Sequence, residues 1–390
     1  MTMNEKRYQA CKMRVFVLLL LGVAAATSVV AVQVTGIVED AEGVPVADIT
    51  VCAYAYDVPD FLPEHRHGST QTDRSGRFTV TTPDTDDVLL VLTGDDGAGR
   101  VRVVPDGEGE LLRLRYPVRT RIILLHDNDL HFNFNHLAAF RAHVDAYRER
   151  YPNVYLLNAG DVFTRHADRW PVPGEEGYFG SAVSMIETMN DVGYDVMTLG
   201  NHELAYVSDR TRQALEKASF PLLGANMEIT TDKLPPLQSH HVFATEERYS
   251  VAVLGLTRFN TDGVNSLNPV VVARRYAHLG DENNVFVALT HIGNQRDREL
   301  AETVDTLDVI IGGHSHGLLE TADTIGDVLF ARAGGTPGGH PVDPELPKFL
   351  GTVTIVLENG AVVSKKGHVK TLDADSPATV TDEKIAPAVR

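Results

Sequence analysis

Residues 121–132 read RIILLHDNDLHF, a run of four aliphatic residues followed directly by a dense group of polar side chains. The aliphatic run is typical of a strand that is buried on both faces. In an extended segment, residues two apart point to the same side, so Asp129 and His131 can reach a common point. The stretch therefore predicts a buried strand that ends at a chemically active site.

Four later apolar segments also end in polar residues, and amphipathic helical segments alternate with them. This alternation predicts an α/β fold with a largely parallel sheet. Because the carboxyl ends of such strands converge on one crevice, residues far apart in sequence can meet there. The polar ends are NAGD with Asp161, GNHE with Asn201 and His202, LTHIG with His291, and GGHSH with His314 and His316.

The α/β rhythm extends over residues 117–372, which we expect to form the catalytic domain. Its amphipathic segments predict helices over residues 136–152, 179–193, 208–219 and 296–306. Near its end, Asn359-Gly360 lies between two apolar runs and predicts a β-hairpin. Residues 373–390 are polar and are expected to form a tail.

Residues 32–116 read as short strands separated by turn residues. Gly43 and Pro45 mark one turn, and DRSG at 73–76 marks another. Several strands at this spacing predict a small all-β sandwich. The segments VTGIVEDAEGVPVADITVCAY and TDRSGRF resemble the carboxypeptidase-regulatory-like, or transthyretin-like, module. The resemblance implies spacing or docking rather than an activity, and it leaves the partner of the β-sandwich open.

Residues 1–31 carry the features of a secretory signal peptide. Four Lys and Arg residues precede the apolar run 15–26, and small residues follow it. The alternative is a retained membrane anchor, because residues 15–34 are nearly long enough to span a bilayer. In either case we expect the rest of the chain to be exported, either secreted or periplasmic, or anchored to the membrane.

The composition of the chain narrows the possible functions. With 390 residues it is long enough for two domains, and its 43% hydrophobic content is typical of a folded soluble protein. The net charge of −18 argues against a nucleic-acid polymer as partner, since phosphate contacts need fields of Lys and Arg. Cys11 lies in the signal-like segment, so Cys52 alone supports neither an internal disulfide nor a Cys-based zinc site.

The side chains expected at the crevice are suited to binding metal ions. Asp, Asn and imidazole ligands bind Mn²⁺, Fe or Zn²⁺. Their number exceeds what one ion needs, and two ions sharing a bridging carboxylate would use them all. Two ions about 3.5–4 Å apart are a known solution for in-line displacement at phosphorus. The expected cofactor is therefore a pair of divalent metal ions, and the expected partner is a small phosphoester.

The blocks HDNDLH, NAGD, GNHE, THIG and GGHSH resemble the calcineurin-like metallophosphoesterases, and among them the 5′-nucleotidase branch. The resemblance covers residues 118–372 and implies a four-layer α/β/β/α sandwich. It also implies roles for eight polar residues of the blocks. Asp129, His131 and His316 would hold a first metal, Asn201, His291 and His314 a second, Asp161 would bridge both, and His202 would stabilise the transition state or protonate the leaving oxygen.

The expected function is therefore an exported hydrolase of phosphomonoesters, nucleotides among them. Two cations lower the pKa of a bridging water, so a metal-bridging hydroxide is available near neutral pH to attack opposite the leaving alkoxide. A protonated His202 can neutralise the charge that develops on that alkoxide. The alternatives are a phosphodiesterase or a sulfur-ester hydrolase on the same fold, or a non-catalytic surface-binding protein.

The sequence departs from the usual pattern of this branch. Members carry an Asp two residues after GNHE that orients the catalytic histidine, whereas this chain has Ala205 there, with Tyr206 or Asp209 as candidate substitutes. Phe132 stands where a Gly is common. The C-terminal domain that grips the nucleoside in full-length nucleotidases is not expected here, so nucleotide selectivity stays open.

Three polar residues inside the blocks are expected to have supporting positions. His126 matches a position that is not a direct ligand, and we expect it to be structural. Asp127 is expected to be solvated. Glu203 is expected to support the neighbouring backbone rather than to bind a metal ion.

Other residues near the blocks have more than one possible role. Arg165, His166 and Arg332 can each serve as a phosphate clamp or as an ordinary surface charge. Trp170 can stack on a base or pack within the protein. In the β-sandwich, the loop residues 65–67 (HRH) are expected to be exposed.

Overall fold

The computed structural model describes residues 32–82, 87–95, 97–104, 111–133, 135–164, 175–336, 346–378 and 380. The signal-like segment 1–31 and the residues Arg165, His166 and Trp170 lie outside these ranges. Within the described ranges, no helix combines the length and the apolar character needed to cross a bilayer.

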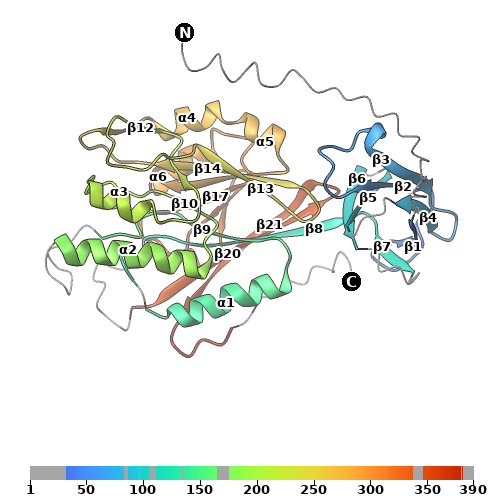
Figure 1. Cartoon of the computed structure of the whole chain (residues 1–390), viewed down its shortest axis with the longest axis horizontal. Coiled ribbons are helices and arrows are strands. Elements are labelled where there is room, and N and C mark those ends of the chain that lie inside the picture. The colour runs from blue at the N-terminus through green and yellow to red at the C-terminus, as the bar shows by residue number, and fades with distance from the viewer. Residues whose placement is uncertain are drawn as a thin grey trace, which may run out of the picture.

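Strands β1 to β7 form a small β-sandwich (Figure 1). One sheet has the strand order β4-β1-β7 and the other has the order β3-β2-β5-β6. Both sheets contribute to one core, which includes Val38, Val51, Phe78 and Leu90. The elements are β1 (Val32–Glu39), β2 (Thr50–Ala55), the 3-10 helix η1 (Pro63–His65), β3 (Arg66–Gln71), β4 (Arg77–Thr82), β5 (Val88–Gly94), β6 (Gly97–Val103) and β7 (Leu112–Arg115).

The first of two larger sheets has the strand order β11-β10-β9-β8-β20-β21. It is parallel from β11 to β8 and antiparallel at β20 and β21, so the carboxyl ends of β8, β9 and β10 lie at one edge. Its strands are β8 (Arg119–Asp127), β9 (Val154–Asn158), β10 (Val196–Thr198), β11 (Leu222–Leu223), β20 (Lys348–Glu358) and β21 (Ala361–Leu372).

The second larger sheet has the strand order β13-β14-β16-β17-β19-β18. Its four central strands are parallel and its two edge strands are antiparallel. A separate antiparallel pair joins β12 and β15. The strands are β12 (Met227–Ile229), β13 (His240–Ala244), β14 (Ser250–Thr257), β15 (Val264–Ser266), β16 (Val285–His291), β17 (Val309–Gly312), β18 (Asp323–Ile325) and β19 (Val328–Ala331).

Helices cover the outer faces of the two larger sheets (Figure 1). Side chains of α1, α2 and α3 pack on the first sheet, and those of α4, α5 and α6 pack on the second. A third apolar layer lies between the sheets. The predicted four-layer α/β/β/α fold is therefore confirmed. The helices are α1 (Leu137–Arg150), α2 (Glu175–Val192), α3 (Asp209–Leu215), α4 (Pro269–Arg275), α5 (His278–Glu282) and α6 (Asn294–Ala301).

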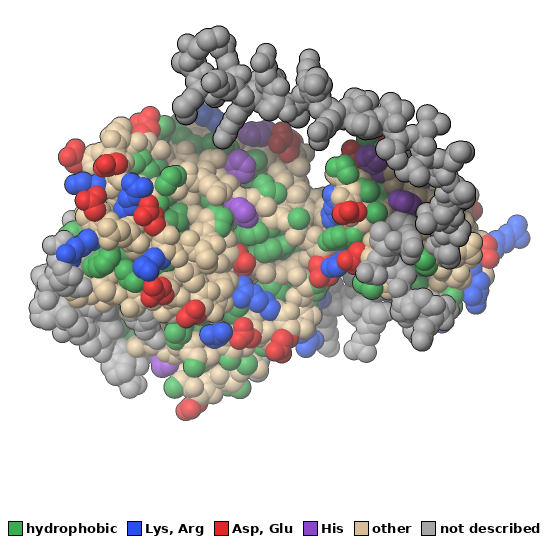
Figure 2. Space-filling view, viewed as in Figure 1, with side chains coloured by type: hydrophobic (Ala, Val, Ile, Leu, Met, Phe, Trp, Pro, Cys, Tyr) green, Lys and Arg blue, Asp and Glu red, His purple; other side chains and the backbone are tan. Residues whose placement is uncertain are grey.

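The surface carries charges of both signs. Figure 2 shows acidic and basic side chains interspersed over one face of the two domains. Residues 65–67 do not form the expected loop, because His65 ends η1 and Arg66 and His67 begin β3, but Arg66 and His67 are exposed as predicted. His65 is only about one-third exposed (35%), because its Nδ1 lies 2.6 Å from Oδ1 of Asp60.

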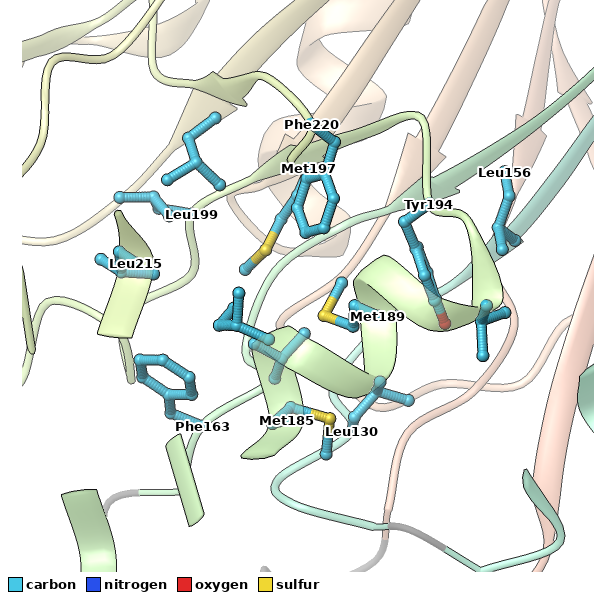
Figure 3. Close-up of a cluster of buried hydrophobic side chains, with 14 of the residues drawn as sticks. Leu130, Leu156, Phe163, Met185, Met189, Tyr194, Met197, Leu199, Leu215 and Phe220 are labelled. Carbon is cyan, nitrogen blue, oxygen red and sulfur yellow. The ribbon is translucent and has the colours of Figure 1, made fainter. Parts of the chain in front are cut away.

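Strand β8 is buried on both faces, as its aliphatic run predicts. Ile123 and Leu125 face the helices α1 and α2, while Ile122 and Leu124 face the second sheet. Figure 3 shows the helix-side layer, in which Met185 and Met189 of α2 lie against side chains from several strands and loops. Apolar packing on both faces fixes the position of the strand, and therefore the position of the polar residues at its carboxyl end.

The helices differ from the sequence expectation in several places. Helix α2 begins at Glu175, four residues earlier than expected, α3 ends at Leu215, four residues earlier than expected, and α5 was not predicted. Helix α6 begins at Asn294 and ends at Ala301, so it starts two residues earlier and ends five residues earlier than expected. Helix α4 was not predicted, because its core sequence Val270–Val272 is β-branched and favours strands. Asn268 caps the helix by accepting hydrogen bonds from the N–H groups of Val270 and Val271, and Pro269 occupies its first turn.

The β-sandwich packs on the end of the catalytic domain where β8 begins. Backbone N–H of Arg100 donates to Oη of Tyr249 at 3.0 Å, and its guanidinium donates to the carbonyl of Arg248 at 2.8 Å. Val118 and Asn359 exchange two hydrogen bonds at the same end. Since β8 carries its polar residues at its other end, the β-sandwich lies far from the candidate site.

The predicted hairpin between β20 and β21 is present. Asn359 and Gly360 both have positive φ, 50° and 89°, as the expected two-residue turn requires. Beyond β21, Ser376 and Asp373 close a turn through their side chains, and Val380 packs against the helix-side core.

Candidate metal centre

The polar residues of the five blocks lie at the carboxyl ends of five strands drawn from both larger sheets. The loops after β8, β9 and β10 come from the first sheet, whereas β16 and β17 belong to the second. The edges of the two sheets therefore face one site from opposite sides. In strand order the side chains are Asp129 and His131, Asp161, Asn201 and His202, His291, and His314 and His316.

The first group of potential ligands consists of Asp129, His131 and His316, whose ligand atoms lie within 4.8 Å of one another. The Nε2 atoms of His131 and His316 are 3.1 Å apart. Nε2 of His316 is 3.4 Å from Oδ1 of Asp129. Asp129 is fully buried, so its carboxylate is shielded from bulk water.

The second group consists of Asp161, His291 and His314. Oδ2 of Asp161 is 3.1 Å from Nε2 of His291. Asn201 joins this group, because its Oδ1 lies 2.7 Å from Nδ1 of His314 and 3.3 Å from Nε2 of His291. The amide oxygen thus points at the same space as the two imidazoles.

Asp161 also belongs to a third group, with His131 and His202. Its Oδ1 accepts a hydrogen bond from the backbone N–H of His202 at 2.7 Å, and its Oδ2 is 3.7 Å from Nε2 of that residue. The rings of His131 and His202 meet edge to face with centroids 4.6 Å apart. Asp161 therefore lies between the two ligand groups, as expected of a bridging residue.

The outer nitrogen of three imidazoles is fixed by a backbone carbonyl. Nδ1 of His131 lies 2.9 Å from the carbonyl oxygen of Phe163, and Nδ1 of His291 lies 2.7 Å from that of Ala159. Nδ1 of His316 is 3.1 Å from the carbonyl of Thr336. A carbonyl can only accept, so each Nδ1 donates, and each Nε2 of a neutral ring presents a lone pair to the site.

The backbone of the site is strained. Residues with positive φ pay a steric cost of about 1–3 kcal/mol each, and they persist where the surrounding structure holds them. Five of the seven predicted ligand residues have positive φ. They are Asp129 (53°), His131 (47°), Asp161 (56°), His314 (72°) and His316 (51°).

Glu203 holds the backbone of two ligand loops. Its Oε2 accepts hydrogen bonds from N–H of Gly200 (2.7 Å) and Asp161 (3.0 Å), and its Oε1 accepts one from N–H of Phe163 (2.8 Å). The residue is fully buried, and burial raises its pKa to about 7. Its predicted role as a support for neighbouring backbone agrees with these contacts.

Burial controls the protonation of the site. It lowers the pKa of His131 to about 3 and that of His314 to about 4, so both rings are neutral, the form that binds cations. Burial also opposes charge on Asp161 and His291, but their mutual attraction is stronger. It raises the pKa of His291 to about 10 and holds the pKa of Asp161 below its usual range.

The profile of the family described as "Calcineurin-like phosphoesterase" matches residues 123–318, which is half of the chain. The chain belongs to the calcineurin-like phosphoesterase family. The matched segment contains the loops of all five blocks.

Curated relatives of this phosphoesterase are about one-quarter identical to it over the aligned segments. Trifunctional nucleotide phosphoesterase protein YfkN of Bacillus subtilis is 26% identical over 304 residues, covering 65% of this chain and 19% of that protein. The 5′-nucleotidase of Bos taurus is 28% identical over 299 residues, covering 66% of this chain and 50% of that protein. The chain thus spans half or less of the length of these two relatives.

A solved structure supports the fold. The 5′-nucleotidase precursor from Thermus thermophilus superposes with a TM-score of 0.51 at 22% identity, covering 65% of this chain and 54% of that chain. At this identity the likeness concerns the fold alone. It agrees with the two helix-covered sheets described above.

Apolar packing anchors the ligand loops of the phosphoesterase. Leu130, Phe163 and Leu199 are buried in the layer between the first sheet and its helices, and Figure 3 shows them in that layer. Each lies within two residues of a predicted ligand. The core therefore holds the site residues in place through their immediate neighbours.

Phe132 occupies a position where a Gly is common in the family, and its surroundings show how the chain accommodates the larger residue. Its φ is 61°, which explains why a Gly suits this position, since Gly adopts positive φ without strain. Its side chain is fully buried and its ring centroid lies 5.5 Å from that of Phe163. Burial of the aromatic ring offsets the backbone strain.

The sequence reasoning missed the loop after β19. N–H of Thr336 donates to the carbonyl of Asp129 at 2.9 Å, and N–H of Ala333 donates to Oδ1 of Asn128 at 3.1 Å. A Cβ on Gly335 would lie 2.7 Å from Cβ of Asp129 and 3.0 Å from Cγ of His316, so only Gly fits. The pair Gly334-Gly335 after a predicted strand was the available signal.

Asp127 was predicted to be solvated, and this was wrong. It is 1% exposed, and it accepts hydrogen bonds from Oη of Tyr194 (2.5 Å) and Nδ2 of Asn158 (2.8 Å). Nζ of the buried Lys348 lies 3.7 Å from its Oδ2. Burial raises the pKa of Asp127, and the nearby ammonium opposes that rise. Its role is to fix the end of β8.

Arg332 is neither a surface charge nor an unpaired phosphate clamp, because its side chain is buried and paired. Its side chain is 2% exposed, and its Nη2 donates to Oδ2 of Asp297 at 3.1 Å. Oδ1 of Asp297 accepts a second hydrogen bond from Oγ1 of Thr290, beside His291. Arg332 therefore belongs to a buried ion pair beneath the β16 end.

His126 is buried, in agreement with its predicted structural role. It is 1% exposed and packs against Gly351 on the neighbouring strand, where no side chain would fit. Neither ring nitrogen has a hydrogen-bond partner in the described part of the chain. Burial lowers its pKa to about 3, so the ring is neutral.

The orientation of His202 in the absence of the usual Asp stays a prediction. Ala205 stands two residues after GNHE, Tyr206 is 43% exposed, and Asp209 begins helix α3. The edge-to-face contact with His131 and the backbone hydrogen bond to Asp161 fix the base of the His202 side chain.

Proposed function

We propose that this phosphoesterase hydrolyses phosphomonoesters, nucleotides among them, with two divalent metal ions. The position of Asp161 between two groups of ligand atoms is the observation that carries the proposal. One ion would be held by Asp129, His131, His316 and Asp161, and the other by Asn201, His291, His314 and Asp161.

The donor set fits cations. Nε2 of His131 and Nε2 of His316 both present lone pairs, because both Nδ1 atoms donate to carbonyls, yet the two Nε2 atoms are only 3.1 Å apart. Two acceptors at this distance repel each other unless a positive charge lies between or beside them. Nε2 of His291 faces oxygens of Asp161 and Asn201, so without a proton on this nitrogen a cation has to lie beside it. The mixture of oxygen and imidazole donors suits Zn²⁺, Mn²⁺ or Fe.

Divalent ions bound there would supply Lewis acidity, drawing charge from the phosphoryl oxygens and making water acidic enough to lose a proton near neutral pH. The protein's own contribution is orientation. Carbonyls and Glu203 fix the ligands and their loops, so little reorganisation accompanies the reaction.

His202 is the group placed to move a proton. Its side chain is 18% exposed, so it borders both the ligand groups and the solvent. From this position Nε2 can donate a proton to the alkoxide that leaves phosphorus. The carboxylate of Asp161 lies 3.7 Å from this nitrogen.

The substrate class rests on the relatives. Proteins named 5′-nucleotidase and nucleotide phosphoesterase match about two thirds of this chain, but the match spans half or less of their own length. We therefore propose nucleotides as one group of substrates among phosphomonoesters. The signal-like residues 1–31 support an exported activity, secreted, periplasmic or anchored to the membrane, which cell fractionation and the N-terminal sequence of the mature protein test.

Metal analysis combined with a substrate panel tests the function. Purified protein should contain two metal ions per chain and should hydrolyse AMP and p-nitrophenyl phosphate faster than a cyclic nucleotide or a sulfur ester. Asp161→Ala should lose metal and activity together. Asp145→Ala, an exposed acid on α1, is the matched control and should retain both. Faster cleavage of the cyclic nucleotide would instead identify a phosphodiesterase. If the metal-loaded protein hydrolysed none of these substrates, the proposal that it is a phosphohydrolase would be wrong.

A further inference from the structure

An open cleft of about 380 Å³ adjoins the ligand His314. One wall is the beginning of α6, with Asn294, and another is the loop that carries His314 and Ser315. The two walls are joined, because N–H of Asn294 donates to Oγ of Ser315 at 3.1 Å. The cleft is therefore a built feature next to the proposed second ion.

Arg258 forms a further side of this cleft. It directly follows Thr257, the last residue of β14, which pairs in register with the ligand His291 of β16. Oγ1 of Thr257 also donates to the carbonyl of Leu199, two residues before the ligand Asn201. The backbone at Arg258 is thus fixed between two segments that carry predicted ligands.

The cleft is cationic and lacks acids among the described residues that line it. Arg258 is exposed and forms no ion pair with any residue that the structure describes, whereas Arg296 is paired with Glu299 at 2.5 Å. Apart from Ile292, the other described lining residues offer amide, hydroxyl, imidazole or backbone groups, and none is a Phe, Tyr or Trp. In a chain of net charge −18, a free guanidinium beside a metal centre is suited to an anion rather than to a stacked base.

We propose that Arg258 and the cleft beside His314 bind a second anionic group of the substrate, a phosphate carried by the leaving group. The protein then favours phosphoanhydrides such as nucleoside diphosphates over esters of neutral alcohols. This inference rests on the proposed phosphohydrolase function and specifies its substrate class.

The reaction balances without another reactant. The oxygen of water forms a bond to the terminal phosphorus and loses a proton to the solvent, the bond between that phosphorus and the bridging oxygen breaks, and the bridging oxygen leaves with the bonding electron pair. Arg258 donates hydrogen bonds to the phosphate on the leaving side, where negative charge increases as the bridging bond breaks. It therefore binds the substrate and also stabilises the leaving group.

Arg258→Gln tests the subsite by comparing ADP with AMP and p-nitrophenyl phosphate. The kcat/KM for ADP should fall by about tenfold or more, the effect of losing a hydrogen bond to a charged group, whereas the values for the two monoesters should stay within about threefold. Arg258→Lys should recover part of the loss, because it keeps the charge without the planar fork. Arg274→Gln, an exposed arginine on α4, is the matched control and should leave all three values unchanged.

Binding provides a second measurement that does not depend on turnover. Methylenediphosphonate should bind wild-type protein more tightly than inorganic phosphate, and Arg258→Gln should remove that difference in calorimetry. An equal loss of kcat/KM for all three substrates, or an unchanged preference for the diphosphonate, would overturn the inference and leave the phosphohydrolase function standing. If wild-type protein cleaves no phosphoester, the proposed function fails, and the calorimetric comparison alone decides whether the anion subsite exists.

Discussion

Oδ2 of Asp161 lies 3.1 Å from Nε2 of His291, and this contact joins the two larger sheets across the site. Both residues are almost completely buried, with side chains 2% and 0% exposed. Without a metal ion, such a pair is stabilised by a proton on the imidazole, and a metal ion has to replace that proton.

Metal binding should therefore release protons. Despite burial, Asp161 raises the pKa of His291 to about 10, so metal-free protein carries this proton throughout the neutral range. Metal affinity should rise as the pH increases from about 6 to about 8, because proton release becomes easier. Calorimetry in buffers of different ionisation enthalpy measures the number of protons released. Affinity that does not vary with pH would show that His291 is neutral before the ion binds.

His202→Ala should keep its metal content and lose about 10²–10⁴-fold in kcat with phosphomonoesters. The reason is that Nε2 of His202 borders the ligand groups without being required by either proposed ion. His278→Ala, an exposed histidine on α5, is the matched control. Loss of metal from the His202 variant would assign it to the ligands, and full turnover would contradict its role in proton transfer.

Glu203→Gln should destabilise the protein by about 2–3 kcal/mol, because one of the oxygens that accept backbone N–H groups becomes a donor. The effect should appear in urea unfolding with metal removed, since Glu203 holds the loops of Gly200 and Asp161 directly. Glu216→Gln on the surface after α3 should change stability little. Equal stability of the Glu203 variant and wild type would mean that the loops hold their shape without this carboxylate.

His126→Met should reduce the loss of stability in mild acid. In the unfolded chain this histidine gains a proton near pH 6.5, but in the folded protein burial lowers its pKa to about 3. Between these values the unfolded state binds one proton more, so stability falls as pH falls, by at most about 1.4 kcal/mol per pH unit. Urea unfolding with a chelator at pH 7, 6 and 5 would measure the slope. A slope that is the same in the variant as in wild type and in His278→Gln would show that His126 does not contribute.

The sequence was most informative where apolar runs are buried on both faces. The run before His126 correctly predicted a central strand, and the polar block after it correctly indicated where the polar ends of five strands meet. Helix α4 was missed because a cap made by Asn268 and Pro269 outweighs the strand preference of three valines.

Residue environments at the site were harder to predict, because they depend on partners far along the chain. Asp127 is buried by Tyr194, 67 residues later, and Arg332 is paired with Asp297, 35 residues earlier. Arg258 has no motif around it, and its importance appears only when the ends of β14, β16 and β17 are placed side by side.

The nine-residue strand β8 leads from the β-sandwich to the metal centre and sets a separation of about 30 Å along its length. The first described strand, β1, belongs to that β-sandwich. Any tether that holds the protein to a surface through its N-terminal side would therefore leave the reaction centre facing the surrounding medium. In that arrangement the β-sandwich would stand between the surface and the candidate metal centre.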